Sequence, residues 1–383
     1  MSLFSHLELV KDNRSHINQH HNLVDVLFLI ITAVTSGCEN WQDIEVYGES
    51  KLNWLRGFRS FKNGIPTRHS IARIFRTVDT DSLLLAMYSW VNQNRVKSAH
   101  PVIAFDGKTI RGASKHIADK LHLVSAFDCE AGLTLFHQTV GSKTNEIPAV
   151  RDLLKILDIN NTVITLDALH CQKETLKQLI SRHADYLVQA KGNQKKLYSA
   201  IQDAFTHQYE SENSEILSHV TQDAGHGRKE VRTIDCLDAR LLPSEIKESW
   251  PSVRTIVAVQ RERTKGNRTS IDTHYYLTSL TDNILISKAI RQHWLIENQQ
   301  HWILDVVFKE DACQINEPLS AQHMALFRRV VRNMIKQHTK SKGSIRSKCV
   351  RACYDDAFRE ELLLVNIFNK VCSRPDGFVE SGV

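Results

Sequence analysis

The sequence lacks the features that mark secreted, zinc-ribbon and membrane proteins. Its eight cysteines are scattered along 383 residues without a CxxC pair, which indicates neither a disulfide framework nor a zinc ribbon. The most apolar stretch, Val26 to Val34, is far shorter than the roughly 20 residues that span a membrane, and no signal-peptide pattern precedes it. We therefore expect a soluble cytoplasmic protein with reduced thiols and no membrane partner.

Charge of either sign is not in strong excess. Lys plus Arg total 49 and Asp plus Glu total 43, so the net charge of +6 permits a nucleic-acid partner without requiring one. With 42% hydrophobic and 24% charged residues, the chain has enough apolar side chains for two or three packed domains.

Residues 1–95 show only helical periodicity and predict an all-α domain. One apolar helix is expected from Leu23 to Val34, a second around Trp41 and a third after Pro66. In the third helix Arg73 and Arg76 point away from the apolar positions, which is compatible with a helix that recognises DNA. A solvated helix face is the alternative interpretation of these two residues.

Residues 96–205 consist of short apolar runs separated by turns and predict an α/β fold. Three consecutive strands come first, and helices and strands then alternate, which is the element order of an RNase H-like mixed sheet. The expected strands are Val102–Phe105, Leu121–Phe127, Leu133–Val140, Val163–Leu166 and Tyr186–Ala190.

Three further segments complete the expected organisation. Residues 206–280 return to a period of two and predict a β-rich insertion. Residues 281–340 form the second part of the core, which begins with one long helix from Asn283 to about Phe308, with Thr281 and Asp282 as the cap candidates. Residues 341–383 form a basic tail. The strands expected in the insertion are Lys229–Cys236, Arg254–Arg261 and His274–Leu280.

Two aspartates follow strands that are expected to be buried. Asp106 ends the apolar run Val-Ile-Ala-Phe, and Asp167 ends the run Val-Ile-Thr-Leu. Such runs are typical of strands buried on both faces, and ligand sites in α/β sheets gather at the carboxyl ends of the strands. If the two strands are neighbours, both carboxylates face one crevice. Each Asp taken alone is as readily explained as a turn former or helix cap.

Glu297 interrupts the apolar face of the long helix. A buried carboxylate needs a cation, a hydrogen-bond network or a raised pKa. A metal ion shared with the two aspartates meets this need, and an ion pair with Arg291 or a hydrogen bond to a neighbouring His is the alternative. At about 100° per residue, the stripe that contains Glu297 also contains Ile286, Ile290, His293 and Leu304.

The three carboxylates suit two Mg²⁺ or Mn²⁺ ions, which prefer carboxylate and water oxygens. Two such ions about 3.5–4 Å apart polarise the attacking and leaving oxygens of an in-line phosphoryl transfer. Asp and Glu supply the acceptor-only ligands that this chemistry needs at neutral pH. The pattern therefore predicts a metal-dependent phosphoryl transfer with Asp106, Asp167 and Glu297 as the ligands.

Several segments, in order along most of the chain, resemble one known family. In the head they are Val24-Asp-Val-Leu-Phe28, Trp41-Gln-Asp-Ile44 and Phe61-Lys-Asn-Gly-Ile-Pro66. In the core they are Phe105-Asp-Gly-Lys-Thr-Ile-Arg-Gly112, Leu166-Asp-Ala-Leu-His-Cys-Gln172, Ala190-Lys-Gly-Asn-Gln194, His226-Gly-Arg228 and His293-Trp-Leu-Ile-Glu-Asn298, continued by His301-Trp-Ile-Leu-Asp305. Together they resemble the ISAs-group transposases of bacterial insertion sequences, including the H-repeat-associated proteins.

This resemblance implies a DDE transposase that cleaves and transfers DNA strands in the cut-and-paste transposition of an insertion sequence. It implies an RNase H-like core with Asp106, Asp167 and Glu297 as the ligands of two Mg²⁺ or Mn²⁺ ions, and a head that is a transposase-associated, DNA-binding domain. The implied partners are double-stranded DNA, as terminal inverted repeats and target DNA, and a second copy of the chain in the DNA complex. The wider group of insertion-sequence transposases often carries a Tyr-Arg-Glu-Lys pattern around the third acid, and of these four residues only the Glu occurs at the corresponding positions of this sequence.

Basic residues near the acids and in the insertion are candidate DNA contacts. Lys108, Arg111 and Lys191 follow the motifs of the core and are placed to contact phosphates, with plain loop solvation as the alternative. Arg228 and Arg232 share one face of a strand, where they grip a DNA backbone or form a cross-strand charge ladder.

The strongest charge asymmetry lies between Pro318 and Tyr354, where nine Lys or Arg occur without one Asp or Glu. Arg328, Arg332 and Lys336 align on one helical face opposite an apolar one. We expect a docked helix that offers these three residues to phosphates, and a merely solvated basic face is the alternative.

Three other functions fit parts of the pattern. His293, Glu297 and His301 have the i, i+4, i+8 spacing of a zinc site, although a zinc hydrolase leaves both aspartates without a role. A catalytically inactive DNA-binding derivative keeps the basic residues, but all three acids are present. A hydrolase using Cys171 and His170 has little support, because adjacent residues seldom face each other productively.

Overall fold

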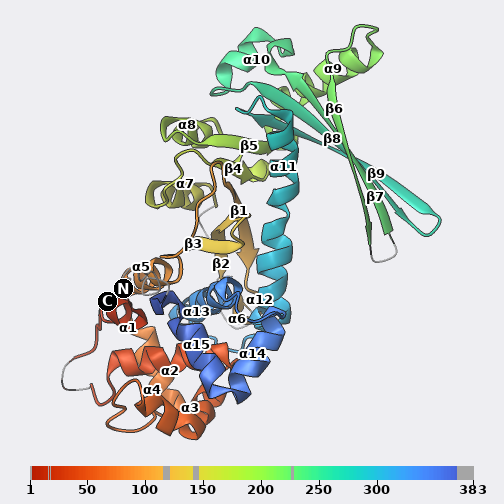
Figure 1. Ribbon diagram of the computed structural model, residues 1–383. Helices are drawn as coiled ribbons and strands as arrows, with labels where there is room; N and C mark the ends of the chain where they lie inside the picture. The colour runs from red at the N-terminus through yellow and green to blue at the C-terminus, as the bar shows by residue number, and fades with distance from the viewer. Residues whose placement is uncertain are drawn as a thin grey trace, which may run out of the picture. The chain divides into compact units, whose positions relative to one another are not determined.

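The computed structural model describes residues 2–15, 17, 19–114, 121–140, 146–225 and 228–368, without the side chains of 113, 114, 228 and 364–368 (Figure 1). The chain divides into two compact units. The sheet unit consists of Val96–Thr109 and His122–His301, and the helical unit consists of Met1–Arg95, Ile110–Leu121 and Trp302–Val383.

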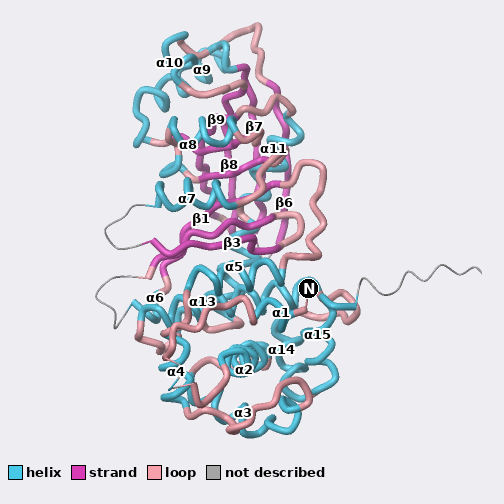
Figure 2. Tube along the Cα trace, turned by 90° about the vertical axis from the view of Figure 1, so that its left-hand side faces the viewer, coloured by secondary structure: helices cyan, strands magenta, loops and turns pink. Residues whose placement is uncertain are grey.

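The sheet unit is built on one nine-stranded mixed sheet, seen as the magenta strands of Figure 2. Its strand order is β3-β2-β1-β4-β5-β9-β8-β7-β6. The strands are β1 (Val102–Thr109), β2 (His122–Asp128), β3 (Leu133–Val140), β4 (Val163–Leu166), β5 (Asp185–Ala190), β6 (Leu217–Gly225), β7 (Arg228–Asp238), β8 (Thr255–Lys265) and β9 (Arg268–Thr278).

The first five strands have the RNase H-like arrangement that the sequence predicts. β1, β2 and β3 form an antiparallel meander, and β4 and β5 add to β1 in parallel. The apolar runs of β1 and β4 are buried throughout their first four residues. Helices α7 (Glu146–Ile156) and α8 (Lys173–Ser181) link these strands and bury their apolar faces. The fold class is therefore confirmed.

The insertion continues the same sheet. β9 pairs with β5 in antiparallel register, from Leu187↔Thr278 to Ala190↔Tyr275, and β8, β7 and β6 follow outward. α9 (Lys195–Glu210) packs its Tyr198 and Phe205 rings on Tyr275, and α10 (Ser244–Ser249) follows β7. The edge strand β6 is exposed along most of its length. It was not predicted, because a strand without a buried face carries no alternation.

The long helix expected from Asn283 to Phe308 is not a single α-helix. α11 (Asn283–His293) begins as predicted, with the Asp282 carboxylate accepting from Ile284 N at 2.8 Å. A π-helix then covers Ile296–His301, before α12 (Trp302–Val306). π turns are rare and occur often at functional sites.

The helical unit gathers around α13, and the N-terminal part is all α-helical as predicted. α13 packs on α2, α4 and α5, and α2 is buried along its whole length. None of the helices in the described residues is long and apolar enough to cross a membrane. The helices are α1 (Leu3–Leu7), α2 (Leu23–Thr35), α3 (Trp41–Arg56), α4 (Arg68–Arg76), α5 (Thr80–Val91), α6 (Arg111–Ser114), α12, α13 (Pro318–Gln337), α14 (Ile345–Tyr354) and α15 (Asp356–Phe368).

The prediction of an exposed basic face on α13 is wrong for two of its three residues. Arg328 is 2% exposed and Arg332 is fully buried, so neither side chain can reach a phosphate. Arg328 donates to the backbone oxygen of Glu39 at 3.4 Å, and Arg332 donates to Asn333 Oδ1 at 3.1 Å. Only Lys336, near the end of the helix, is exposed. The sequence pattern did not predict the burial of Arg328 and Arg332, because helices from distant parts of the chain cover both faces of α13.

Candidate active site

Asp106 and Asp167 stand side by side in the parallel register of β1 and β4. The pairing runs through Val102↔Val163, Ile103↔Ile164 and Ala104↔Thr165, so two residues further along it reaches Asp106 and Asp167. Neighbouring strands lie about 4.8 Å apart. The two carboxylates therefore lie at the same end of this strand pair, although β1 continues past Asp106 to Thr109 instead of ending before it.

Glu297 joins this end of the strand pair from the π-helix. His301, on the same π-helix, places its Nδ1 atom 3.4 Å from Asp106 Oδ2 and 3.8 Å from Glu297 Oε2. One ligand atom of each of Asp106, Glu297 and His301 lies within 4.8 Å of the others. Two of the three predicted acids thus share one cluster with a histidine, and the third is next to it in the sheet.

The electrostatics of this cluster are those of crowded carboxylates. Burial raises the pKa of Asp106 to about 6, and the charges of Glu297 and Asp167 act in the same direction, against the opposing effect of His301. A hydrogen bond with His301 lowers the pKa of Glu297, assisted by the charge of Lys108. Asp106 is therefore the carboxylate whose ionised form a nearby cation would stabilise most.

The sequence argument for Glu297 assumed a buried side chain, and that assumption is wrong. The Glu297 side chain is 55% exposed. The π turn breaks the spacing of 100° per residue that the argument applied to the whole helix. Glu297 lies beside Asp106 because of this local turn, which the pattern of apolar residues does not encode.

The donor set fits a hard divalent cation. Three carboxylates offer oxygen atoms, and a bound cation would lower the raised pKa of Asp106. The residues that could hold such an ion are Asp106 and Glu297, with Asp167 from the neighbouring strand and His301 from the same cluster.

The other chemistries considered from the sequence are less compatible with this geometry. His293, required for a zinc site with Glu297 and His301, shares a hydrogen bond of 2.9 Å with Thr165 Oγ1 through its Nδ1 atom and lies outside the cluster. Cys171 is fully buried, and burial raises its pKa to about 12, which disfavours a nucleophilic thiolate.

The basic residues predicted near the acids have different surroundings. Lys108 lies on β1 and is largely buried, where its charge acts on Glu297 rather than outward. Lys191, just after β5, is exposed. Arg111 belongs to the helical unit, is 81% exposed and lies 3.9 Å from Asp311 Oδ2 through its Nε atom.

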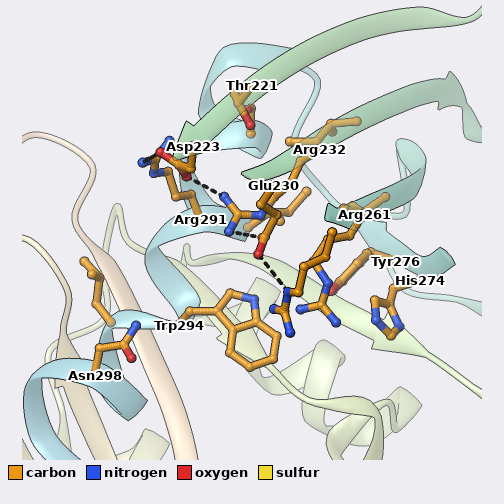
Figure 3. Close-up of a pocket in the computed structure, with 16 residues that line it drawn as sticks. Thr221, Asp223, Glu230, Arg232, Arg261, His274, Tyr276, Arg291, Trp294 and Asn298 are labelled. Carbon is orange, nitrogen blue, oxygen red and sulfur yellow. Dashed lines mark hydrogen bonds and ion pairs between the residues drawn. The ribbon is translucent and has the colours of Figure 1, made fainter. Parts of the chain in front are cut away.

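Arg232 is part of a cross-strand charge ladder, the alternative interpretation from the sequence. It pairs with Glu230 and, at 3.1 Å, with Asp223. Figure 3 shows this ladder along a hollow of about 380 Å³, with the indole of Trp294 at its side. Arg263 and Arg291 extend the ladder through Glu230 and Asp223. The side chain of Arg228 lies outside the described residues.

Arg73 and Arg76 are exposed on α4, opposite the buried Ile71, Ile74 and Phe75. Neither arginine forms an ion pair or a side-chain hydrogen bond within the described part of the chain. Arg73 borders two hollows of about 550 and 480 Å³, one on each side of the helix. These two guanidinium groups are therefore available to an external anion.

Sequence reasoning did not connect three residues with the aspartates: His122 and Glu146, which it left out, and His170, which it weighed only as a partner of Cys171. His170 Nε2 lies 3.8 Å from Asp167 Oδ1, and Glu146 joins it to His122. In the sequence, the one feature that relates any of them to an aspartate is the place of His170 inside the Leu166–Gln172 motif. His122 and Glu146 come from a different strand and helix.

Comparisons with known proteins show which families and relatives this chain is similar to. The family model described as "Transposase DDE domain" matches residues 97–334, and the model described as "DDE_Tnp_1-associated" matches residues 4–91. The chain is 33% identical over 368 residues to "Putative transposase YncI" of Escherichia coli O157:H7, covering 94% of each chain. It is 32% identical over 381 residues to "H repeat-associated putative transposase YhhI" of Escherichia coli strain K12, covering 94% of this chain and 97% of the relative.

Among solved structures, a synaptic complex of the piggyBac transposase with hairpin DNA matches with a TM-score of 0.45 and 9% identity, over 97% of this chain and 80% of the other. This similarity is too weak to bear on function.

Proposed function

Because this chain belongs to the family of transposases with a DDE domain, we propose that it cleaves and transfers DNA strands in the cut-and-paste transposition of an insertion sequence. Asp106, Asp167 and Glu297 are the proposed ligands of two Mg²⁺ or Mn²⁺ ions. The substrate is double-stranded DNA, as the terminal inverted repeats of the element and the target.

One observation carries this proposal. The register of β1 and β4 brings Asp106 and Asp167 to one end of this strand pair, and the π-helix adds Glu297 there. Asp106 lies between the other two acids in this arrangement, since it contacts the Glu297–His301 pair on one side and the strand of Asp167 on the other. Asp106 is therefore the proposed bridging ligand.

The protein's own groups have distinct roles in this scheme. Divalent ions held here would supply activation of the attacking oxygen and charge neutralisation on the phosphate and the leaving oxygen. Asp106, Asp167 and Glu297 hold the ions as acceptor-only ligands, and His301 orients Asp106 and Glu297 through its Nδ1 atom. Lys108 offsets part of the negative charge beside Glu297.

DNA recognition is proposed for residues outside the acidic cluster. Arg73 and Arg76 of α4 are exposed and unpaired among the described side chains, and α4 carries no acidic residue. Lys191 and Arg111 are exposed as well. Guanidinium and ammonium groups of this kind contact phosphates and, from a helix, base edges.

The test separates cleavage from binding. Asp106→Asn, Asp167→Asn and Glu297→Gln keep the side-chain shapes and remove the charges, so each is expected to reduce cleavage of the element's end by roughly a thousand-fold or more. A gel shift with the same terminal repeat is expected to show unchanged binding. Asp152→Asn, at an exposed acid of α7 paired with Lys155 at 2.8 Å, is the matched control and should cleave normally. Normal cleavage by all three core variants contradicts the proposed function.

A further inference from the structure

A chain of polar side chains connects the ends of β1 and β2 to Asp167. We call its three central residues the His122–Glu146–His170 cluster. Its contacts are Thr109 Oγ1 to His122 Nδ1 at 2.8 Å, His122 Nε2 to Glu146 Oε1 at 2.7 Å, Glu146 Oε2 to His170 Nε2 at 3.5 Å, and His170 Nε2 to Asp167 Oδ1 at 3.8 Å.

Glu146 organises this cluster. Contacts with His122 and then with His170 lower the pKa of Glu146 to about 2, so its carboxylate only accepts hydrogen bonds. Both histidines place an Nε2 atom beside this carboxylate. The Nδ1 atom of His122 shares a hydrogen bond with the Thr109 hydroxyl. His170, 1% exposed, has its Nε2 atom between the carboxylates of Glu146 and Asp167.

The cluster also lies against β1 at the residue after Asp106. A Cβ atom at Gly107 would lie 2.6 Å from both Glu146 Oε2 and His122 Nε2. Consecutive residues of a strand face opposite sides of the sheet, so the cluster supports β1 from the face opposite the Asp106 side chain. Because His170 is also three residues after Asp167, the cluster links the ends of the two strands that carry the aspartates.

Asp167 needs such support more than Asp106 does. Its side chain is 49% exposed, and its Oδ1 atom accepts from Leu169 N at 3.1 Å and faces His170. No described residue donates to Oδ2. Both contacts therefore engage one oxygen and leave the other for an external ligand, which is the arrangement of a pre-oriented metal ligand.

We propose that His170, held by Glu146 and His122, is a positioning residue that fixes the Asp167 carboxylate for a divalent ion. This inference rests on the proposed function of Asp167. It assigns a role to three residues outside the acidic triad and explains why glycine follows Asp106, since any side chain there displaces the cluster.

The experiment measures Mn²⁺ binding by the full-length protein, from the electron paramagnetic resonance signal of the free ion. His170→Leu removes the N–H and is expected to raise the Mn²⁺ dissociation constant by about 10–100-fold. Glu146→Ala, which releases His170, should act in the same direction. His170→Gln keeps an N–H donor and should stay within about threefold of the wild type. The Mn²⁺ concentration for half-maximal cleavage should shift in parallel, whereas binding of the terminal repeat should not change.

The matched control is His323→Leu, at a histidine of the helical unit that is 1% exposed and bonded to Thr80 Oγ1 at 2.9 Å. It should lower stability and leave the Mn²⁺ constant unchanged. A wild-type Mn²⁺ constant for His170→Leu overturns the proposal, and if that variant does not fold, a wild-type constant for Glu146→Ala does so. Asp167→Asn distinguishes failure of the proposed function from failure of this inference. If Asp167→Asn cleaves normally, the proposed function fails. If Asp167→Asn is inactive while the His170 and Glu146 variants bind Mn²⁺ normally, only this inference fails.

Discussion

Arg329 and Glu310 form an ion pair from which solvent is excluded. Arg329 Nη1 donates to Glu310 Oε1 at 2.6 Å, and neither side chain has exposed surface. This pair explains how Arg329 of α13 lies buried in the helical unit, because an acid from another segment neutralises its guanidinium group.

Breaking this pair should destabilise the protein strongly. Glu310→Gln leaves the Arg329 charge buried without its counter-charge, and we expect the free energy of unfolding to fall by about 3–5 kcal/mol. Urea denaturation measures it. Asp152→Asn, which breaks the exposed pair with Lys155, should cost less than about 1 kcal/mol. Equal effects of the two substitutions contradict the assigned burial.

The metal-free protein should become more stable when Asp106 loses its charge. The folded-state pKa of Asp106 is raised from 3.8 to about 6, so the stability that its protonated form contributes is complete below about pH 3.8 and is lost as the pH rises through about 6. At 1.36 kcal/mol per pKa unit, the ionised group costs roughly 3 kcal/mol at pH 8. Asp106→Asn should therefore be more stable than the wild type at pH 8 without metal, and nearly equal at pH 4. Denaturant midpoints at both pH values decide this, and a less stable variant at pH 8 refutes it.

Replacing Arg73 and Arg76 should weaken binding of the terminal repeat and reduce its salt dependence. Each phosphate contact contributes about 0.9 to the slope of log K against log salt concentration. The double substitution Arg73→Ala with Arg76→Ala should therefore lower the slope by roughly 1.8. Arg346→Ala, at an exposed arginine of α14, is the control and should leave the slope unchanged. An unaltered slope in the double variant would assign α4 to packing alone.

Gly107→Ala should disturb the His122–Glu146–His170 cluster. The added methyl group would meet Glu146 and His122 at 2.6 Å, and we expect a loss of about 1–3 kcal/mol in stability. Gly192→Ala is the control, because a Cβ atom there meets nothing within 4 Å. Calorimetric unfolding of both variants provides the comparison. Equal stability would mean that the cluster moves aside without cost.

Local sequence was sufficient for the elements whose residues carry their own pattern. The apolar runs before Asp106 and Asp167 predicted two buried strands and the position of both acids, because each strand is buried on both faces. The cap at Asp282 followed from its place before an apolar periodicity. Strand β6 was missed because most of its side chains face solvent and show no period.

The sequence by itself determined the RNase H-like order of the core, the carboxylates that follow the apolar runs of β1 and β4, and the amphipathic α4 with its two arginines. Only the tertiary structure decided that Glu297 is exposed on a π turn, that Arg328 and Arg332 are buried, and that Glu146 and two histidines support Asp167. The physical reason is the range of the interactions. An element's period and caps depend on neighbours within one or two turns, whereas burial and charge pairing depend on segments far along the chain, as Thr80 and His323 show by bonding across 243 residues.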